Sequence, residues 1–367
     1  MKNLLTAFAA LAVAVVLPAQ DLLNLPEASS RGGVSQDIGI TKVSVDYGRP
    51  AVNKREVWGK LVPYGLNDLG GGTTAAAPWR AGANVNTIVS FSTDVKVGGQ
   101  PLPAGDYGLH MILAESGDVT VIFSKNSRAW GSFFYDPADD AARVQTKWED
   151  APHHELLTYE FSDITKNSAT LSLFWDTKRI PIAITADTDA LVVAGMKRDL
   201  STDRGFDDRA WVAASTYLVQ NNLDLNLALE WADRAIDVRT NGRVNFEGLS
   251  NKAVILERLD RSEEAAALMD QALPLGNALQ IHQYGRQLIG AKKAGRALEV
   301  FQLNARKHPD VWPVNYGLAR GYSAVGNYPA ALEALQKAQK QVPAGDTVNA
   351  AAIETNIEKL KRGEDIN

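Results

Sequence analysis

The sequence predicts two domains of different kinds, an all-β antiparallel sandwich-like domain followed by an all-α solenoid of helical repeats. Three observations predict this fold class. The chain has 367 residues, a length typical of two domains. In its first half, apolar side chains fall at every second position of short runs, the period of a strand with one buried face. From about Phe206 the period changes to 3.6 residues and helix pairs repeat.

Composition and charge exclude several classes of protein and site. The sequence is 45% apolar and 22% charged, as in ordinary globular proteins. It has no Cys, which excludes disulfides, thiolate zinc sites, cysteine nucleophiles and a lipid-modified cysteine. The net charge is −5, with 15 basic and 21 acidic residues over positions 21–190 and 22 of each over positions 191–367. Neither nucleic acid nor an anionic membrane surface is therefore a favoured partner.

Residues 1–20 have the pattern of a secretory signal peptide. Lys2 precedes an apolar run over residues 4–17, and the small residue Ala19 lies where polar sequence begins. This run is shorter than the roughly 20 apolar residues that cross a bilayer, and no later stretch of the sequence is longer. We expect cleavage after Ala19 or Gln20 and a periplasmic or secreted protein without a membrane span.

The β-rich domain is expected over residues 26–186. Its alternating runs are 41–47, 87–92, 118–123, 157–161 and 169–175, and they are separated by Gly, Pro, Asn and Asp. Many short strands with no helical pattern between them indicate an antiparallel sandwich or barrel-like fold. An irregular insertion, residues 65–78, is expected to be a mobile surface loop, and residues 187–205 are expected to be a linker.

The helical repeats are expected over residues 206–345. Two units correspond at a spacing of 34 residues, where Gly285, Ala297, Phe301 and Pro309 match Ala319, Ala331, Leu335 and Pro343. Helix packing explains these positions: small residues lie where two helices touch, a bulky residue fills the seam between them, and Pro ends the second helix. This register resembles the tetratricopeptide repeat. We expect about four helix pairs and a C-terminal capping helix within residues 346–363.

Six phrases of the first half occur together and in order, at residues 34–39, 45–50, 61–64, 79–84, 102–107 and 130–135. They include Tyr-x-Arg-Pro, Trp-Arg-x-Gly-Ala-Asn, Leu-Pro-Ala-Gly-x-Tyr and Trp-Gly-x-x-x-Tyr. Together they resemble the exported bacterial domain-of-unknown-function family number 2911. The resemblance implies export, a β-rich fold and a helical-repeat tail, but no established reaction. That family runs from Pro-Tyr-Gly almost straight into Trp-Arg, so the insertion 65–78 is a departure that remodels whatever it borders.

The same phrases hold most of the aromatic and arginine side chains that favour a ligand surface. These candidates are Tyr47, Arg49, Arg55, Trp58, Tyr64, Trp79, Arg80, Asn84, Trp130 and Tyr135. Arg offers a planar donor fork, and Tyr and Trp offer apolar faces with a polar group. Together they could bind an anionic or glycan-like ligand. In the alternative interpretation, the arginines bind carboxylates or loop carbonyls and the tryptophans form the core.

Catalytic and metal signatures are weak. The sequence contains no nucleophile elbow, zinc-protease helix, P-loop or dinucleotide fingerprint, so no cofactor is expected. His153 and His154 are expected in a turn, and adjacent residues rarely bind one metal, so we expect no metal site. Two acidic pairs, at positions 139–140 and 149–150, are expected to be solvated turn residues. His110 is the one histidine expected on a strand near the candidate surface.

The helical repeats predict a protein or peptide partner, because stacked helix pairs present a concave docking surface. One unit carries a basic patch suited to an acidic peptide, formed by Lys292, Lys293, Arg296, Arg306 and Lys307. An ordinary solvated face is the alternative interpretation of this patch. His282 and His308 are isolated in the repeats and are expected to be surface or packing residues.

Two hypotheses of function follow. In the first, the protein is an exported, non-enzymatic binding or scaffold protein, whose β domain presents the Tyr/Trp/Arg surface and whose repeats dock a protein. In the second, it is an exported hydrolase or glycan-processing enzyme that uses the Arg/Asn/His cluster of the β domain. The second requires His110 or a carboxylate within about 3 Å of a pocket that Arg80 or Asn84 also lines.

Overall fold

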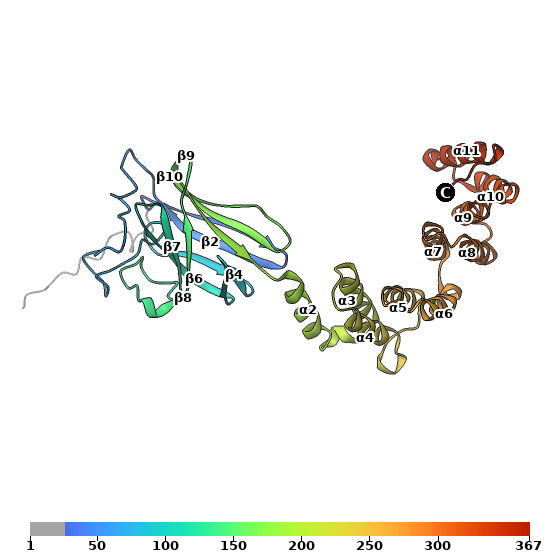
Figure 1. Ribbon diagram of the computed structural model, residues 1–367, viewed down its shortest axis with the longest axis horizontal. Helices are drawn as coiled ribbons and strands as arrows, with labels where there is room; N and C mark the ends of the chain where they lie inside the picture. The colour runs from blue at the N-terminus through green and yellow to red at the C-terminus, as the bar shows by residue number, and fades with distance from the viewer. Residues whose placement is uncertain (1–25) are drawn as a thin grey trace, which may run out of the picture. The chain divides into compact units, whose positions relative to one another are not determined.

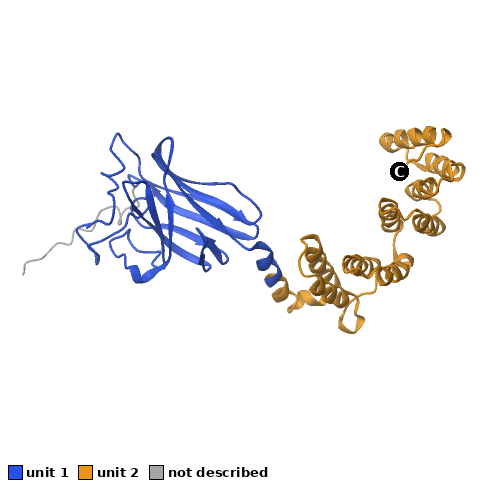
Figure 2. Ribbon diagram, in the orientation of Figure 1, with its two compact units in different colours: residues 1–194 blue, residues 195–367 orange. Residues whose placement is uncertain are grey.

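The computed structural model describes residues 26–367, so the expected signal peptide lies outside the described residues. The chain divides into two compact units, residues 1–194 and 195–367 (Figure 2). The first unit holds the strands and the second holds the helix pairs (Figure 1). The predicted fold class is confirmed.

The first unit is built from two antiparallel sheets. A six-stranded sheet has the order β1-β2-β3-β6-β7-β8, and a four-stranded sheet has the order β5-β4-β10-β9. The strands are β1 (Ser30–Ile38), β2 (Thr41–Arg49), β3 (Thr87–Phe91), β4 (Val95–Val97), β5 (Gln100–Leu102), β6 (Gly105–Leu113), β7 (Asp118–Ser124), β8 (Asp140–Lys147), β9 (Glu149–Ser162) and β10 (Ser168–Thr185).

One hydrophobic core joins the two sheets. In β2, Val43 and Val45 are buried while the alternate residues Lys42, Ser44 and Asp46 are not, as the period of two predicts. From the other sheet, Leu173 and Trp175 of β10 enter the same core. The β domain is therefore a sandwich with its apolar faces turned inward.

Strands that lack an apolar alternation were not predicted. β1 is a polar edge strand that pairs with β2 over its whole length, from Ser30 opposite Arg49 to Ile38 opposite Thr41. His153 and His154, expected in a turn, lie inside β9, where His154 pairs with Asp176 of β10. These strands are held by backbone hydrogen bonds, which a side-chain pattern does not report.

The segment expected to be a linker, residues 187–205, is largely helical. It contains α2 (Thr188–Asp199) and the first part of a short 3-10 helix, η2 (Asp203–Phe206). α2 begins on the β domain, because the Thr188 hydroxyl donates to the Lys166 carbonyl at 2.7 Å and its side chain lies against Gly39. The period of so short a helix is hard to recognise within polar sequence.

The insertion 65–78 contacts the β domain at several points. Asn67 and Ala77 exchange two backbone hydrogen bonds, of 2.9 and 2.8 Å, across its base. Gly65 donates to the Leu113 carbonyl at 2.8 Å, and Thr73 donates to the Phe133 carbonyl at 2.9 Å. The insertion therefore forms a hairpin-like loop joined to the end of β6 and to the segment after β7.

Four helix pairs and a capping helix form the second unit, as predicted. The helices are α3 (Asp208–Gln220), α4 (Leu225–Ile236), α5 (Phe246–Arg258), α6 (Ser262–Ala272), α7 (Ala278–Gly290), α8 (Ala294–Lys307), α9 (Trp312–Ala324), α10 (Tyr328–Gln341) and α11 (Thr347–Lys361). Consecutive helices pack in pairs, α3 with α4 through α9 with α10. No helix in the described part of the chain is both long and apolar enough to cross a membrane.

The 34-residue register marks the helix seams. Phe301 is fully buried, and its ring lies against Gly285 of α7 and against Gly317 and Gly321 of α9. In the next pair, Ala319 and Leu335 occupy the corresponding positions and are also fully buried. Beyond α11 the chain returns to α9, where Asp365 accepts a 2.6 Å hydrogen bond from Ser323 and Ile366 is buried.

Candidate functional site

The structure separates the ten candidate residues of the β domain into several groups. Tyr47 is buried in the core, where its hydroxyl accepts a hydrogen bond of 3.1 Å from the backbone N–H of Tyr159. Arg49 donates to the Leu157 carbonyl and the Thr158 hydroxyl, at 3.0 and 2.8 Å. Arg55 donates to carbonyls of its own loop. For Tyr47 and Arg49 the geometry is that of the alternative, structural interpretation.

Trp58, Tyr64 and Trp79, all from the segment 49–80, form an aromatic cluster with Trp148 and Trp175. The Trp58 ring lies 6.0 Å from Trp79 and from Trp175, and 5.8 Å from Trp148. Trp79 and Trp175 are stacked with ring centroids 6.0 Å apart. Such contacts stabilise the fold, and they also leave one side of Trp79 and Trp175 in the wall of a cleft.

This cleft brings together four of the predicted residues, Arg55, Trp79, Arg80 and Asn84. Its volume is about 490 Å³, which lies in the range of small-ligand sites. The other lining residues come from the 61–63 and 67–69 segments, the loop after Trp79, and the single residues Ser29, Pro50, Ala77, Pro78, Ser132 and Trp175. We call it the Arg80 cleft.

Arg80 is the most constrained charged side chain of the cleft. Its Nη1 donates to the Asn84 carbonyl at 2.6 Å. Its guanidinium lies 5.4 Å from the Trp130 ring and 5.5 Å from the Phe133 ring, and it rests against the backbone of Gly131. Burial lowers the pKa of Arg80 below its usual value. Trp130 thus contributes to the site by covering Arg80.

Behind Arg80 lies a Ser–His pair that the sequence reasoning missed. The Oγ of Ser132, a cleft residue, is 2.8 Å from Nδ1 of His110 on β6, and both side chains are buried. Burial, and after it the charge of Arg80, lower the pKa of His110 to about 4, so the ring is neutral at pH 7. No local motif announces this pair, since its members are 22 residues apart and meet only in the folded sheet.

Tyr135 belongs to a separate polar cluster beside this pair. Its hydroxyl donates to Oδ2 of Asp140 at 3.0 Å and accepts from Arg143 at 2.7 Å, which also pairs with Asp140 at 2.6 Å. Burial and then Asp140 raise the pKa of Tyr135 to about 12. The prediction that Asp140 is a solvated turn residue is wrong, because its carboxylate is largely buried at the start of β8.

The remaining histidines form no metal site. His153 lies 3.3 Å from both Glu155 and Asp176 on exposed strand surface, and Nδ1 of His154 donates to the Pro152 carbonyl at 2.8 Å. Over residues 26–367 no group of three His, Asp or Glu side chains is arranged to hold a metal ion. In the repeats, His282 packs on Phe301, and burial followed by Arg286 and Arg320 lowers its pKa to about 4.

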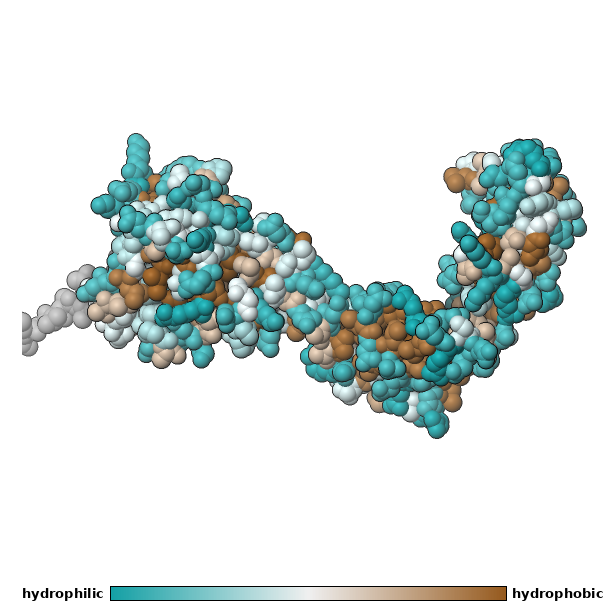
Figure 3. Space-filling model, viewed as in Figure 1, coloured by the Kyte–Doolittle hydropathy of each residue, from teal (hydrophilic) through white to brown (hydrophobic). Residues whose placement is uncertain are grey.

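The repeats contain a groove of about 720 Å³ bordered by α3, α5, α6 and α7. Apolar side chains on its floor include Val254, Met269 and Tyr284. Figure 3 shows apolar surface gathered over this part of the repeat unit, and Val254 is 49% exposed. Amide side chains add hydrogen-bonding groups, among them Asn251 and the exposed Gln283 and Gln287.

The predicted basic patch is divided between two places. Lys293 and Arg296 line the groove, but Lys293 lies 3.6 Å from Glu257, and Arg296 pairs with Asp270 and Glu299. Lys307 donates to the carbonyls of Pro274 and Gly276, at 2.7 and 3.0 Å. Lys292 and Arg306 are exposed and do not line the groove.

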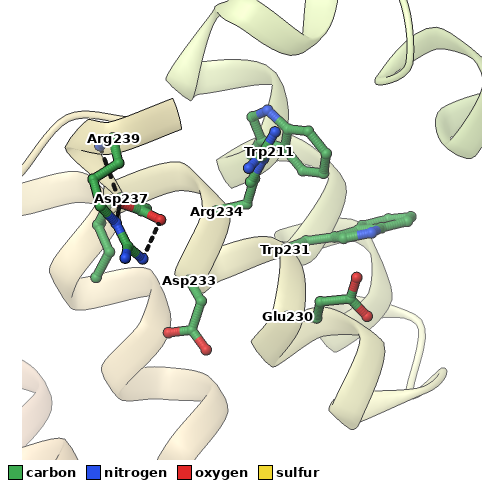
Figure 4. Close-up of a pocket in the computed structure, with 8 residues that line it drawn as sticks. Trp211, Glu230, Trp231, Asp233, Arg234, Asp237 and Arg239 are labelled. Atoms are coloured by element: carbon green, nitrogen blue, oxygen red, sulfur yellow. Dashed lines mark hydrogen bonds and ion pairs between the residues drawn. The ribbon is translucent and has the colours of Figure 1, made fainter. Parts of the chain in front are cut away.

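A second hollow in the repeats, of about 520 Å³, lies along α4 (Figure 4). Arg234 is stacked on Trp211 at 5.7 Å, and Arg239 forms hydrogen bonds of 2.9 Å with both carboxylate oxygens of Asp237. Asp233, labelled in Figure 4, is paired with Lys252 at 2.6 Å. The pairs of Asp237 and Asp233 neutralise most of this charge, and among the described residues of the lining Glu230 and Arg234 have no ion pair.

Comparisons with known proteins agree with this division of the chain. Residues 29–184 match the family described as "Protein of unknown function (DUF2911)", which confirms the resemblance found in the sequence phrases. None of the curated proteins compared with the chain matches it.

Among solved structures, the helical part is similar to YrrB, described as a TPR protein with an unusual peptide-binding site. The identity is 20% and the TM-score 0.31, over 45% of this chain and 83% of YrrB. It is also similar to MamA from Desulfovibrio magneticus RS-1, at 20% identity and a TM-score of 0.28, over 43% of this chain and 97% of that one. The tetratricopeptide-like fold is evident from the four helix pairs and their register.

Proposed function

We propose that this chain is an exported, non-enzymatic binding protein, whose repeats dock a protein partner and whose β domain presents a ligand surface. One observation carries the proposal, the open groove of the repeats with apolar and amide side chains on one face. Export is inferred from residues 1–20 alone.

The groove suits an extended peptide segment. Its amide side chains can hydrogen bond to the backbone of a peptide, while Val254, Met269 and Tyr284 accept apolar side chains. Asn251 is held in place for this role, because it accepts from Thr216 at 2.9 Å and donates to Ser215 at 2.6 Å. Lys293 and Arg296 are paired with carboxylates of the chain, whereas Arg258 lines the groove with only the Asn222 amide oxygen as its partner among the described residues, which favours an acidic residue at that end of the segment.

A peptide-display experiment tests this function with the full chain as bait. We expect selected peptides to be acidic with spaced apolar residues, and to bind wild type at least tenfold more tightly than Val254→Glu, which places a charge on the groove floor. Val348→Glu is the matched control, since Val348 is an equally simple exposed helical valine outside the groove. Peptides that bind both variants as tightly as wild type would place docking elsewhere.

The Arg80 cleft is the part of the predicted ligand surface that the fold assembles. It gathers two arginines, an indole face and polar loop atoms around one hollow. These groups support the proposal of an anionic or glycan-like ligand, since arginine forks and aromatic faces recognise both classes.

A second candidate function is a hydrolase or glycan-processing enzyme. The Ser132–His110 hydrogen bond favours it, because a neutral imidazole beside a hydroxyl in a cleft with Arg80 is the arrangement that nucleophilic catalysis uses. It ranks second because Ser132 is 1% exposed and a histidine of pKa about 4 is a weak base.

A fluorophosphonate probe distinguishes the two functions. Covalent labelling of the wild-type chain that is lost in Ser132→Ala and kept in Ser127→Ala would establish the enzyme. We expect no labelling of the wild-type chain or of the two variants, because a binding protein needs no activated serine.

A further inference from the structure

Arg80 is a half-buried cation without a counter-ion. Of its guanidinium nitrogens only Nη1 has a hydrogen-bond acceptor, the neutral Asn84 carbonyl, and no carboxylate of residues 26–367 forms an ion pair with it. Two other arginines of the β domain each donate from two nitrogens to oxygens of the chain: Arg49 to the Leu157 carbonyl and the Thr158 hydroxyl, and Arg179 to the Ser172 hydroxyl and the Glu149 carboxylate. A buried charge that lacks a partner is costly, so its retention at a cleft points to a partner that is not part of this chain.

The surroundings of Arg80 are built to hold its charge at the cleft. Trp130 and Phe133 cover the guanidinium with their rings, 5.4 and 5.5 Å away. Gly131 permits this approach, because a Cβ there would lie 2.5 Å from Nη1 of Arg80. Removing water in this way strengthens any ion pair that the remaining nitrogens form.

A second donor of the cleft wall also lacks an acceptor. The indole N–H of Trp175 is buried and has no hydrogen-bond partner in the described structure. A guanidinium group donates only, so the free nitrogens of Arg80 require acceptor oxygens from the occupant of the cleft.

The charges of the lining set the charge of that occupant. Arg55 and Arg80 contribute two positive charges, and Asp68, whose carboxylate accepts from the Gly70 N–H at 2.8 Å, contributes one negative charge. Glu27 lies just outside and is bonded to the Asn84 amide at 2.6 Å. One excess positive charge matches a monoanion better than a phosphate dianion, and Leu61, Pro63 and Trp79 offer apolar surface beside it.

We propose that the Arg80 cleft binds an organic monocarboxylate, with the carboxylate paired to the free side of Arg80 and the apolar body against Trp79. This inference rests on the proposed ligand surface and names its ligand class. Ser132 and His110 support the site from behind, and because His110 faces Arg80 it senses the charge placed there.

Benzoate and benzamide test the proposal with the full-length protein. The two compounds have nearly the same shape, but only benzoate carries a charge. Tryptophan fluorescence follows the titrations, because Trp79 and Trp175 line the cleft. We expect saturable binding of benzoate about 10- to 100-fold tighter than that of benzamide, the range of a charge-assisted hydrogen-bond pair. Inorganic phosphate should bind more weakly than benzoate.

Variants assign the effect to Arg80. We expect Arg80→Gln to remove the preference for benzoate, and Arg80→Lys to restore part of it. Arg128→Gln is the control. Arg128 is an exposed arginine of the segment 125–135, which also contains Trp130 and Phe133, but it does not line the cleft. A second readout needs no variant: bound benzoate offsets the charge of Arg80, so the pKa of His110, followed by NMR, should rise with benzoate and stay constant with benzamide.

Three results would overturn the proposal in different ways. Equal affinities for benzoate and benzamide would remove the carboxylate anchor and leave the ligand surface in place. If phosphate binds more tightly than benzoate, the ligand is an inorganic or organic dianion and not a monocarboxylate. No saturable binding of any of the three, with the His110 pKa unchanged, would remove the cleft as an anion site, while peptide docking by the repeats would still be measured independently through Val254→Glu.

Discussion

Replacing Gly285 by Ala tests the seam of the repeats. A Cβ at this position would lie 2.6 Å from Cζ and 2.7 Å from Cε1 of Phe301. The ring cannot retreat, because Cβ positions at Gly317 and Gly321 would be 2.8 and 2.9 Å from its other atoms. Overpacking of this kind costs about 1–3 kcal/mol. The better helix propensity of Ala returns about 1 kcal/mol, so we expect no gain and a net loss of up to about 2 kcal/mol in the free energy of unfolding.

Urea unfolding followed by circular dichroism at the helical band measures this loss. Gly295→Ala is the matched control, because no atom lies within 4 Å of a Cβ there and the same change in a helix should stabilise by up to about 1 kcal/mol. If Gly285→Ala stabilises the protein as much as Gly295→Ala does, the seam is not tightly packed.

The next helix pair provides a rescue. There Ala319 and Leu335 occupy the positions of Gly285 and Phe301. The double variant Gly285→Ala/Phe301→Leu reproduces that pair of side chains, so its loss should be smaller than the sum of the single losses by about 0.5–3 kcal/mol. Additive losses would show that the two positions do not contact each other.

Three further predictions concern both units. The pKa of His110 is about 4 in the folded protein and higher when unfolded, so the unfolded state binds the extra proton and stability should fall by about 3 kcal/mol as the pH drops from about 6.5 to 4; His110→Asn should reduce this slope in thermal unfolding. Tyr135→Phe removes the hydroxyl between Asp140 and Arg143 and should destabilise the β domain by about 1–2 kcal/mol in urea unfolding, with no change if the cluster is replaced by water. Ile366→Ala should cost about 2 kcal/mol and speed hydrogen exchange in α11, because Ile366 is 5% exposed in the core of the last helices.

Much of the fold could be predicted because side-chain periods carry it. The strand runs around Val43, Val89 and Leu171 and the 34-residue register around Phe301 all place buried residues at regular spacing. β1 and β8 were missed because edge strands are held by backbone hydrogen bonds and tolerate polar side chains on both faces. α2 was missed because its apolar face is weak and its first residue is fixed by a contact with the distant Lys166 carbonyl.

The candidate site was predicted only in part, for a different reason. Residue type identified Arg80 and Trp79, but it could not separate them from Arg49 and Tyr47, which have the same chemistry and serve the core. The difference is that Arg49 and Tyr47 find their hydrogen-bond partners within the chain, whereas most of the guanidinium nitrogens of Arg80 do not. Ser132 shows the opposite failure, since nothing in the sequence links it to His110 and only the fold of the segment after β7 brings the two side chains within 2.8 Å.

The insertion 65–78 links the departure from the family pattern to the cleft. Asn67, Asp68, Leu69, Ala77 and Pro78 all line the Arg80 cleft, so the insertion forms one of its walls. The resemblance implies that related domains run from Pro-Tyr-Gly almost straight into Trp-Arg and lack this wall. In this chain the insertion adds the carboxylate of Asp68 to a lining that also holds Arg55 and Arg80, which sets the excess positive charge of the lining to one. The insertion therefore narrows the charge of the ligand that the cleft accepts.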